Sequence, residues 1–152
     1  RDFVVSGASK RGWTAWTTAA FDERVVGVVP MVIDMLNLVP SFENHFRSYG
    51  EFSLAVQEYV NYNIQDWMET EEFKVLMSYI EPYSFKDQFT MPKYIINAGS
   101  DEFFSTDSWK FYYDKLPDFV KSHALYQSLI QNKVITDVNE TMDTFCLNCI
   151  AF

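Results

Sequence analysis

Apolar residues follow two different periods in the first part of the chain. Residues 3–6 form a short apolar run that predicts a buried strand, and residues 10–21 place Trp13 and Trp16 on one face of a predicted helix. Residues 25–33 are an almost continuous β-branched run, which is typical of a parallel strand buried on both faces. Strand, helix and strand in this order predict a βαβ unit.

The pattern changes between residues 37 and 90, which are polar and rich in aromatic side chains. Helical spacing predicts helices near residues 53–63 and 66–79, and such an insertion is where a substrate cap is expected. The expected organisation is one domain over residues 1–132, a helical insertion over residues 37–90, and an unassigned tail over residues 133–152.

The strand pattern returns at residues 92–98 and is followed by a turn rich in small and acidic residues. A helix is predicted from Asp107 or Ser108 to Leu116, because Asp and Ser cap helices and Pro117 would end it. Residues 122–132 predict an amphipathic helix.

A serine stands where the first predicted strand meets the first predicted helix. Gly7, Ala8 and Ser9 form a Gly-x-Ser turn between them, and a strand, such a turn and a helix are the parts of a nucleophile elbow in an α/β-hydrolase. The usual second glycine is displaced, since Arg11 stands two residues after the serine and Gly12 three. The alternative is that Ser9 only caps the helix.

The residues of a hydrolase triad occur here in the expected order of serine, acid and histidine, as Ser9, Asp101 and His123. In such a triad the imidazole removes the serine proton, and the carboxylate fixes the imidazole tautomer. Asp34 ends the second predicted strand and is the competing acid. His45 precedes Asp101 and lies in the insertion, which is the wrong place for the base.

Composition excludes several classes of function. The 152 residues include 21 acidic and 12 basic side chains, and the net charge of -9 argues against nucleic-acid binding. No apolar stretch approaches the ~20 residues needed to span a membrane. The spacing of histidines and carboxylates predicts no metal site, and no cofactor is expected.

Two features near the C-terminus are weak signs of an extracellular setting. Cys146 and Cys149 form a Cys-x-x-Cys pair without a second pair of ligands, so an inert pair or a disulfide is expected. Asn139 begins an N-glycosylation sequon, which has meaning only in a secreted protein.

Three stretches resemble the PhoPQ-activated pathogenicity-related protein family: FVVSGASKRGWT at residues 3–14, VPMVIDMLN at 29–37 and MPKYIINAGSDEFF at 91–104. The resemblance implies a partial α/β-hydrolase fold with Ser9 as nucleophile, Asp101 as acid and the Lys10 N–H in the oxyanion hole. Family members place the histidine in a loop after a further strand. Here Pro117 is followed almost at once by His123, so that strand is expected to be missing.

The resemblance also implies a function. The intact protein is expected to be secreted and to cleave a small-molecule ester or a peptide through an acyl-enzyme on Ser9. The chain begins directly in a strand, so it is expected to be a fragment that is inactive by itself. Because the family includes a secreted proliferation repressor, the alternative is a non-catalytic signalling protein that binds a cell-surface receptor.

Overall fold

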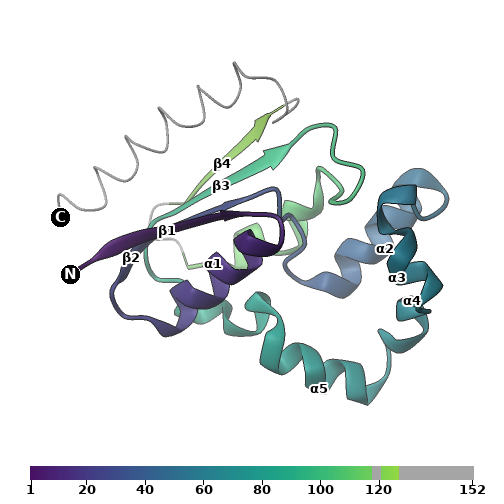
Figure 1. Cartoon of the computed structure of the whole chain (residues 1–152), viewed down its shortest axis with the longest axis horizontal. Coiled ribbons are helices and arrows are strands. Elements are labelled where there is room, and N and C mark those ends of the chain that lie inside the picture. The colour runs from purple at the N-terminus through teal and green to yellow at the C-terminus, as the bar shows by residue number, and fades with distance from the viewer. Residues whose placement is uncertain (118–120, 127–152) are drawn as a thin grey trace.

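Four parallel strands form the centre of the computed structural model, which describes residues 1–117 and 121–126, the last six by their backbone alone (Figure 1). The strands lie side by side in chain order: β1 (Phe3–Ala8), β2 (Val25–Met31), β3 (Lys93–Ala98) and β4 (Lys121–Tyr126). One row across the sheet joins Ala8, Met31, Ile96 and Ala124. The carboxyl ends of all four strands therefore meet at one edge of the sheet.

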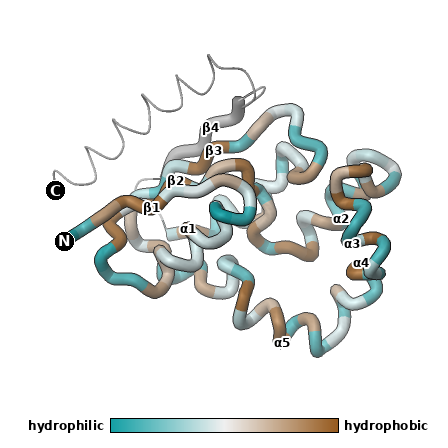
Figure 2. Tube along the Cα trace, in the orientation of Figure 1, coloured by the Kyte–Doolittle hydropathy of each residue, from teal (hydrophilic) through white to brown (hydrophobic). Residues whose placement is uncertain are grey.

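Helix α1 (Lys10–Phe21) connects β1 to β2 and packs on both strands. Its Trp16 is buried against Phe89, with ring centroids 4.7 Å apart. Val28 and Val29 are successive residues of β2 and are both fully buried, so both faces of this strand are covered, as predicted. Figure 2 shows the hydrophobic residues gathered along the strands.

Four helices follow β2 and lie beyond the carboxyl ends of the strands (Figure 1). They are α2 (Leu38–Tyr49), α3 (Gln57–Asn61), α4 (Ile64–Trp67) and α5 (Glu71–Ile80). They surround a second core of Phe42, Val56, Met68 and Phe73. A 3₁₀ segment, η2 (Pro82–Gln88), leads back toward β3.

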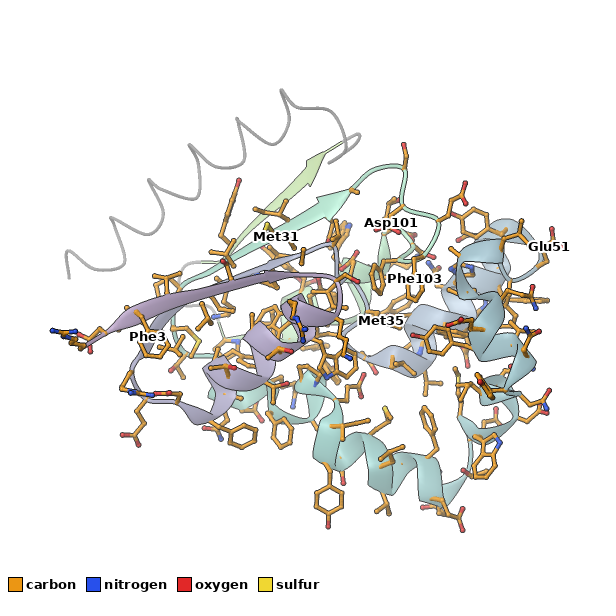
Figure 3. All side chains as sticks on the ribbon, viewed as in Figure 1. Phe3, Met31, Met35, Glu51, Asp101 and Phe103 are labelled. Atoms are coloured by element: carbon orange, nitrogen blue, oxygen red, sulfur yellow. The ribbon has the colours of Figure 1, made fainter. Side chains whose placement is uncertain are left out.

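Met35 and Phe103 join the two cores, because each packs against both of them. Figure 3 shows these two side chains between the sheet and the insertion, with Asp101 close to Phe103. Within the insertion, the buried carboxylate of Glu81 accepts hydrogen bonds from the N–H groups of Leu38 and Asn37 and so ties the end of α5 to the start of α2. The insertion is therefore docked against the edge where the strands end.

Several predicted elements differ from the structure. The helix expected over residues 66–79 is two helices, because the side chain of Thr70 accepts the N–H of Phe73 and starts α5 separately. The helix expected near residues 53–63 is a 3₁₀ turn, Leu54–Val56, followed by the short α3. The predicted strand 25–33 ends at Met31, since Val32 has a left-handed φ of 44°.

The C-terminal predictions also need correction. Residues expected to form a helix up to Leu116 form two 3₁₀ turns, η3 (Ser108–Phe111) and η4 (Tyr113–Lys115). The helix predicted over residues 122–132 is wrong for residues 122–126, which belong to β4. A fourth strand, β4, does pair with β3 in this region, but His123 lies within it and not in a loop after it. The domain boundaries remain predictions.

Candidate active site

Ser9 occupies a strained turn between β1 and α1. Its φ of 52° and ψ of -127° lie in a region that few residues other than glycine adopt. The side chain is exposed and does not cap α1, so the capping alternative is wrong. The backbone N–H of Ser9 donates to the carbonyl of Met31 at 2.9 Å, which fixes the turn to the end of β2.

Two glycines make this turn sterically possible. A Cβ on Gly7 would lie 2.3 Å from the backbone oxygen of Arg11, and a Cβ on Gly12 would lie 2.6 Å from Cγ2 of Ile33. Gly12 also faces Gly7, since its Cβ would come within 3.0 Å of the Gly7 oxygen. The glycine displaced by one position in the sequence therefore still serves the close approach of α1 to β1 and β2.

Asp101 lies in the turn after β3, at the same edge of the sheet as Ser9. Its Oδ1 accepts the N–H groups of Phe103 at 2.8 Å and Phe104 at 3.0 Å. Its Oδ2 has no hydrogen bond to any described residue. The carboxylate is half-buried, so one oxygen holds the turn and the other is available to orient a further group.

The insertion holds the backbone of this acid turn at three successive residues. Tyr49 Oη donates to the Asp101 carbonyl at 3.3 Å, and Ser53 Oγ donates to the Glu102 carbonyl at 2.6 Å. His45 forms a hydrogen bond with the backbone of Phe103. The position of Asp101 therefore depends on the insertion as well as on β3.

His45 is a structural histidine. It is 3% exposed, its Nε2 accepts the N–H of Ser53 at 3.1 Å, and burial lowers its pKa. Because the ring accepts one hydrogen bond and makes another with Phe103, both sides of the neutral imidazole are engaged. These contacts are consistent with the sequence-based expectation that His45 is not the base.

Asp34, the competing acid, is buried away from solvent and has its own partners. Its Oδ1 accepts the phenol of Tyr112 at 2.5 Å, and its Oδ2 accepts the N–H of Trp109 at 3.1 Å. Burial raises the pKa of Asp34 to about 7, although hydrogen bonds from Tyr112, Trp109 and Asn97 oppose that rise. The contacts of Asp34 fix η3 to the end of β2.

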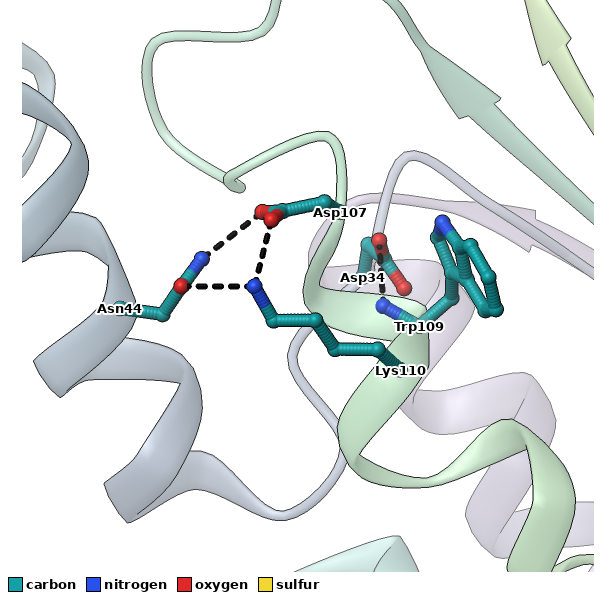
Figure 4. Close-up of polar contacts among 5 residues, drawn as sticks. All are labelled: Asp34, Asn44, Asp107, Trp109 and Lys110. Atoms are coloured by element: carbon teal, nitrogen blue, oxygen red, sulfur yellow. Dashed lines mark hydrogen bonds and ion pairs between the residues drawn. The ribbon is translucent and has the colours of Figure 1, made fainter.

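A closed ring of polar contacts lies beside Asp34 and ties α2 to η3 (Figure 4). Asn44 Nδ2 donates to Asp107 Oδ1 at 2.8 Å, and Lys110 Nζ donates to Asn44 Oδ1 at 2.9 Å and to Asp107 Oδ2 at 2.5 Å. Burial alone would raise the pKa of Asp107, but these hydrogen bonds outweigh it and lower that pKa. This ring is a further link between the insertion and the segment that follows Asp101.

The backbone of His123 lies inside β4, opposite Ile95 of β3. β4 is three strand spacings from β1, or about 14 Å, and His123 precedes the row of Ala8 and Ala124. The side chain of His123 is outside the described part of the chain, as are Asn139, Cys146 and Cys149. Their predicted roles remain predictions.

The described residues contain neither a cluster of metal ligands nor a membrane-spanning helix. Within them, no three His, Cys, Asp or Glu side chains gather as ligands of a metal ion would. None of their helices is long and apolar enough to cross a membrane.

The sequence of residues 1–149 matches the profile of the PhoPQ-activated pathogenicity-related protein family. The chain belongs to this family. Autocrine proliferation repressor protein A of Dictyostelium discoideum is 37% identical over 122 residues, which cover 80% of this chain and 25% of that protein. The chain thus spans about a quarter of the length of this relative.

Solved structures agree with the fold. The acetyl xylan esterase from Paenibacillus sp. R4 has a TM-score of 0.70 at 19% identity, covering 95% of this chain and 44% of the esterase. Acetyl xylan esterase 1 from Thermoanaerobacterium has a TM-score of 0.63 at 17% identity, covering 91% and 43%. VinJ has a TM-score of 0.59 at 14% identity, covering 97% and 66%. The predicted α/β-hydrolase fold is confirmed, and the chain spans less than half of either esterase.

Sequence patterns indicate Ser9, Asp101 and Asp34 as candidates, but not the side chains that hold this region together. Tyr112 and Lys110 fall in the segment that the sequence predicts as a helix, and no motif marks either of them or Asn44. Their partners are 63 to 78 residues away in the chain, so no local pattern pairs them.

Proposed function

We propose that this family member is a serine-hydrolase-type protein in which Ser9 is the nucleophile and Asp101 the acid. The observation that carries the proposal is the turn at Ser9, where a non-glycine residue takes a left-handed φ of 52° between strand and helix with its hydroxyl exposed. Strain of this kind persists only where surrounding structure enforces it, and it concentrates at functional sites. The close packing of Gly7 and Gly12 supplies that enforcement.

The spacing of the two residues supports the same chemistry. β1 and β3 are two strand spacings apart, or about 10 Å, and Ser9 and Asp101 follow the carboxyl ends of these strands. A gap of this size leaves room for an imidazole that bonds the serine on one side and the carboxylate on the other. His123 remains our prediction for that base.

The reaction would proceed through an ester on the enzyme. The Ser9 hydroxyl attacks the substrate carbonyl while the base takes its proton, and the resulting oxyanion accepts the backbone N–H of Lys10. That N–H opens α1 and has no partner within the helix, so it is available for this role. Collapse of the intermediate expels an alcohol or amine that takes the proton from the base, and water then hydrolyses the acyl-Ser9.

Covalent labelling with a fluorophosphonate probe tests the proposal, both on this chain and on a longer protein that contains it. Labelling is expected to depend on Ser9 and to be lost in Ser9→Ala. Ser100→Ala is the matched control, because Ser100 is also exposed and lies beside Asp101. Labelling that persists in Ser9→Ala, or that is absent from a folded longer protein, would contradict the proposal.

A second pair of variants tests the base. His123→Ala is expected to abolish labelling. His45→Gln is expected to retain labelling, provided that the variant still folds. Equal labelling of the parent chain and His123→Ala would show that another residue removes the serine proton.

A second candidate function is a binding scaffold without catalysis. The placement of His123 within β4, rather than in a loop after it, favours this candidate. So does the relative named as a proliferation repressor. Such a protein would be secreted and would bind a cell-surface receptor. Cell binding that survives Ser9→Ala would support it, whereas ester turnover that requires Ser9 would favour the enzyme.

A further inference from the structure

The insertion contains a pocket of about 510 Å³ between α2 and the segment around α4. That volume is in the range of small-molecule sites. Its apolar walls come from Val39, Phe42, Phe46, Phe52 and Met68. Phe42 and Met68 also belong to the second core, so packing against that core holds this part of the apolar wall in place.

The polar lining of this pocket is mostly acidic. Glu43, Asp66 and Glu69 contribute three carboxylates against the single guanidinium of Arg47. Arg47 is engaged with Glu43 at 3.1 Å, and neither Asp66 nor Glu69 forms a salt bridge with a described residue. The lining is therefore net negative through Asp66 and Glu69, although Lys74 lies close enough to interact with the charge of Glu69.

An amide oxygen in the lining is shielded from solvent without being satisfied. Gln65 Oε1 is buried and has no hydrogen-bond partner among the described residues. Gln65 belongs to α4 and lines the pocket beside Asp66. No water-sized group reaches this oxygen from the pocket, so Gln65 is part of the pocket wall and offers no acceptor to a ligand.

We propose that this pocket binds an ammonium or guanidinium group carried on an apolar or aromatic body. The aromatic faces and Met68 suit the body, and the carboxylates of Asp66 and Glu69 suit the cation. Neither Ser9 nor Asp101 lines the pocket, so the site is separate from the proposed catalytic residues. The proposal therefore stands whether or not Ser9 is a nucleophile.

Calorimetric titration of the full chain with 4-phenylbutylammonium tests the proposal, with 4-phenylbutanol as the uncharged probe of the same body. The ammonium is expected to bind more tightly than the alcohol, and salt is expected to weaken the ammonium alone. Asp66→Asn and Glu69→Gln are each expected to weaken ammonium binding by about two- to fivefold, as for partly exposed ion pairs. Equal affinity for ammonium and alcohol would overturn the proposal, as would no binding of either at millimolar concentration.

Control variants separate a local effect from a general one. Glu23→Gln makes the same change in net charge on the exposed turn before β2, outside the pocket, and is expected to leave affinity unchanged. Thermal unfolding checks that each variant folds. Ser9→Ala is expected to bind with unchanged affinity. Weakening by Glu23→Gln as strong as that by Glu69→Gln would show only a non-specific charge effect and overturn the proposal.

A last comparison identifies the source of the cation. An acetylated Phe-Lys amide carries the same ammonium on a peptide, so its affinity is compared with that of the free amine. Tighter binding of the peptide would support a peptide side chain as the ligand, and tighter binding of the free amine would support a small amine.

Discussion

Tyr112 and Asp34 form a buried pair in which the phenol donates to Oδ1 of the carboxyl group over 2.5 Å. Both residues are 1% exposed, and the pair joins η3 and its flanking residues to the end of β2. Because the second oxygen accepts the N–H of Trp109, both oxygens of Asp34 are engaged. Asp34 therefore organises the segment that follows Asp101.

The raised pKa of Asp34 makes folding stability depend on pH. The folded chain holds the proton more tightly than the unfolded chain, with a pKa of about 7 against 3.8. The contribution of Asp34 is therefore complete below about pH 4 and declines as pH rises toward about 7. A shift of this size corresponds to a free energy on the order of 4 kcal/mol.

Asp34→Asn is expected to remove that decline, because an amide carries no charge and can still accept from Trp109 and donate to Tyr112. The free energies of unfolding of the parent chain and the variant, measured in denaturant at about pH 5 and about pH 8, isolate the effect. The variant should gain stability relative to the parent between the two pH values. Parallel changes in both proteins would contradict the assigned pKa.

Tyr112→Phe removes one donor from the same carboxyl group. We expect a loss of about 1.5–3 kcal/mol at about pH 8, where the carboxylate is charged, and a smaller loss at about pH 5. Tyr79→Phe, on the exposed face of α5, is the matched control and should change stability little. An equal loss at both pH values would mean that the hydrogen bond of the phenol does not depend on the charge of Asp34.

The two glycines of the Ser9 turn should differ in their tolerance of a methyl group. Alanine at Gly12 gains about 1 kcal/mol of helix propensity, and its shortest contact is with the side chain of Ile33 at 2.6 Å, while the backbone oxygen of Gly7 is 3.0 Å away. The shortest contacts of alanine at Gly7 are with the backbone oxygen and carbon of Arg11, at 2.3 and 2.5 Å, and backbone yields less readily than a side chain. Gly7→Ala is therefore expected to destabilise more than Gly12→Ala, which should lose about 1–3 kcal/mol. Chemical denaturation of both variants checks the order, and the reverse order would contradict the packing described.

The βαβ unit and the turn at Ser9 could be predicted because their signals are local. Apolar runs mark β1 and β2, and small residues mark the turn between β1 and α1. Helix α2 was missed because Pro40 stands in its first turn and its apolar residues face the insertion's own core. Two residues nevertheless indicate the ends of this helix. Pro40 falls in the first turn, where proline is tolerated, and Gly50 follows Tyr49, where a left-handed glycine commonly ends a helix.

The parts that could not be predicted depend on distant partners. The ring of Asn44, Asp107 and Lys110 joins residues more than 60 positions apart, and nothing in either segment indicates the other. The same is true of the hydrogen bonds that hold the backbone of Asp101 and Glu102 from the insertion. Sequence therefore predicted which residues carry the proposed chemistry, but not what positions them.

Val32 gives a last prediction about strain beside the site. Its φ of 44° is unfavourable for a β-branched side chain, and its N–H is fixed by a 2.7 Å bond to the carbonyl of Ile96. The sheet therefore enforces a conformation that only glycine adopts without cost. Val32→Gly and Val32→Ala both remove the branched side chain, but only glycine relieves the φ. Val32→Gly is expected to be more stable than Val32→Ala by about 1 kcal/mol, measured by denaturant unfolding. Equal stabilities would show that the backbone at residue 32 is not strained, and that the turn after β2 follows its path for another reason.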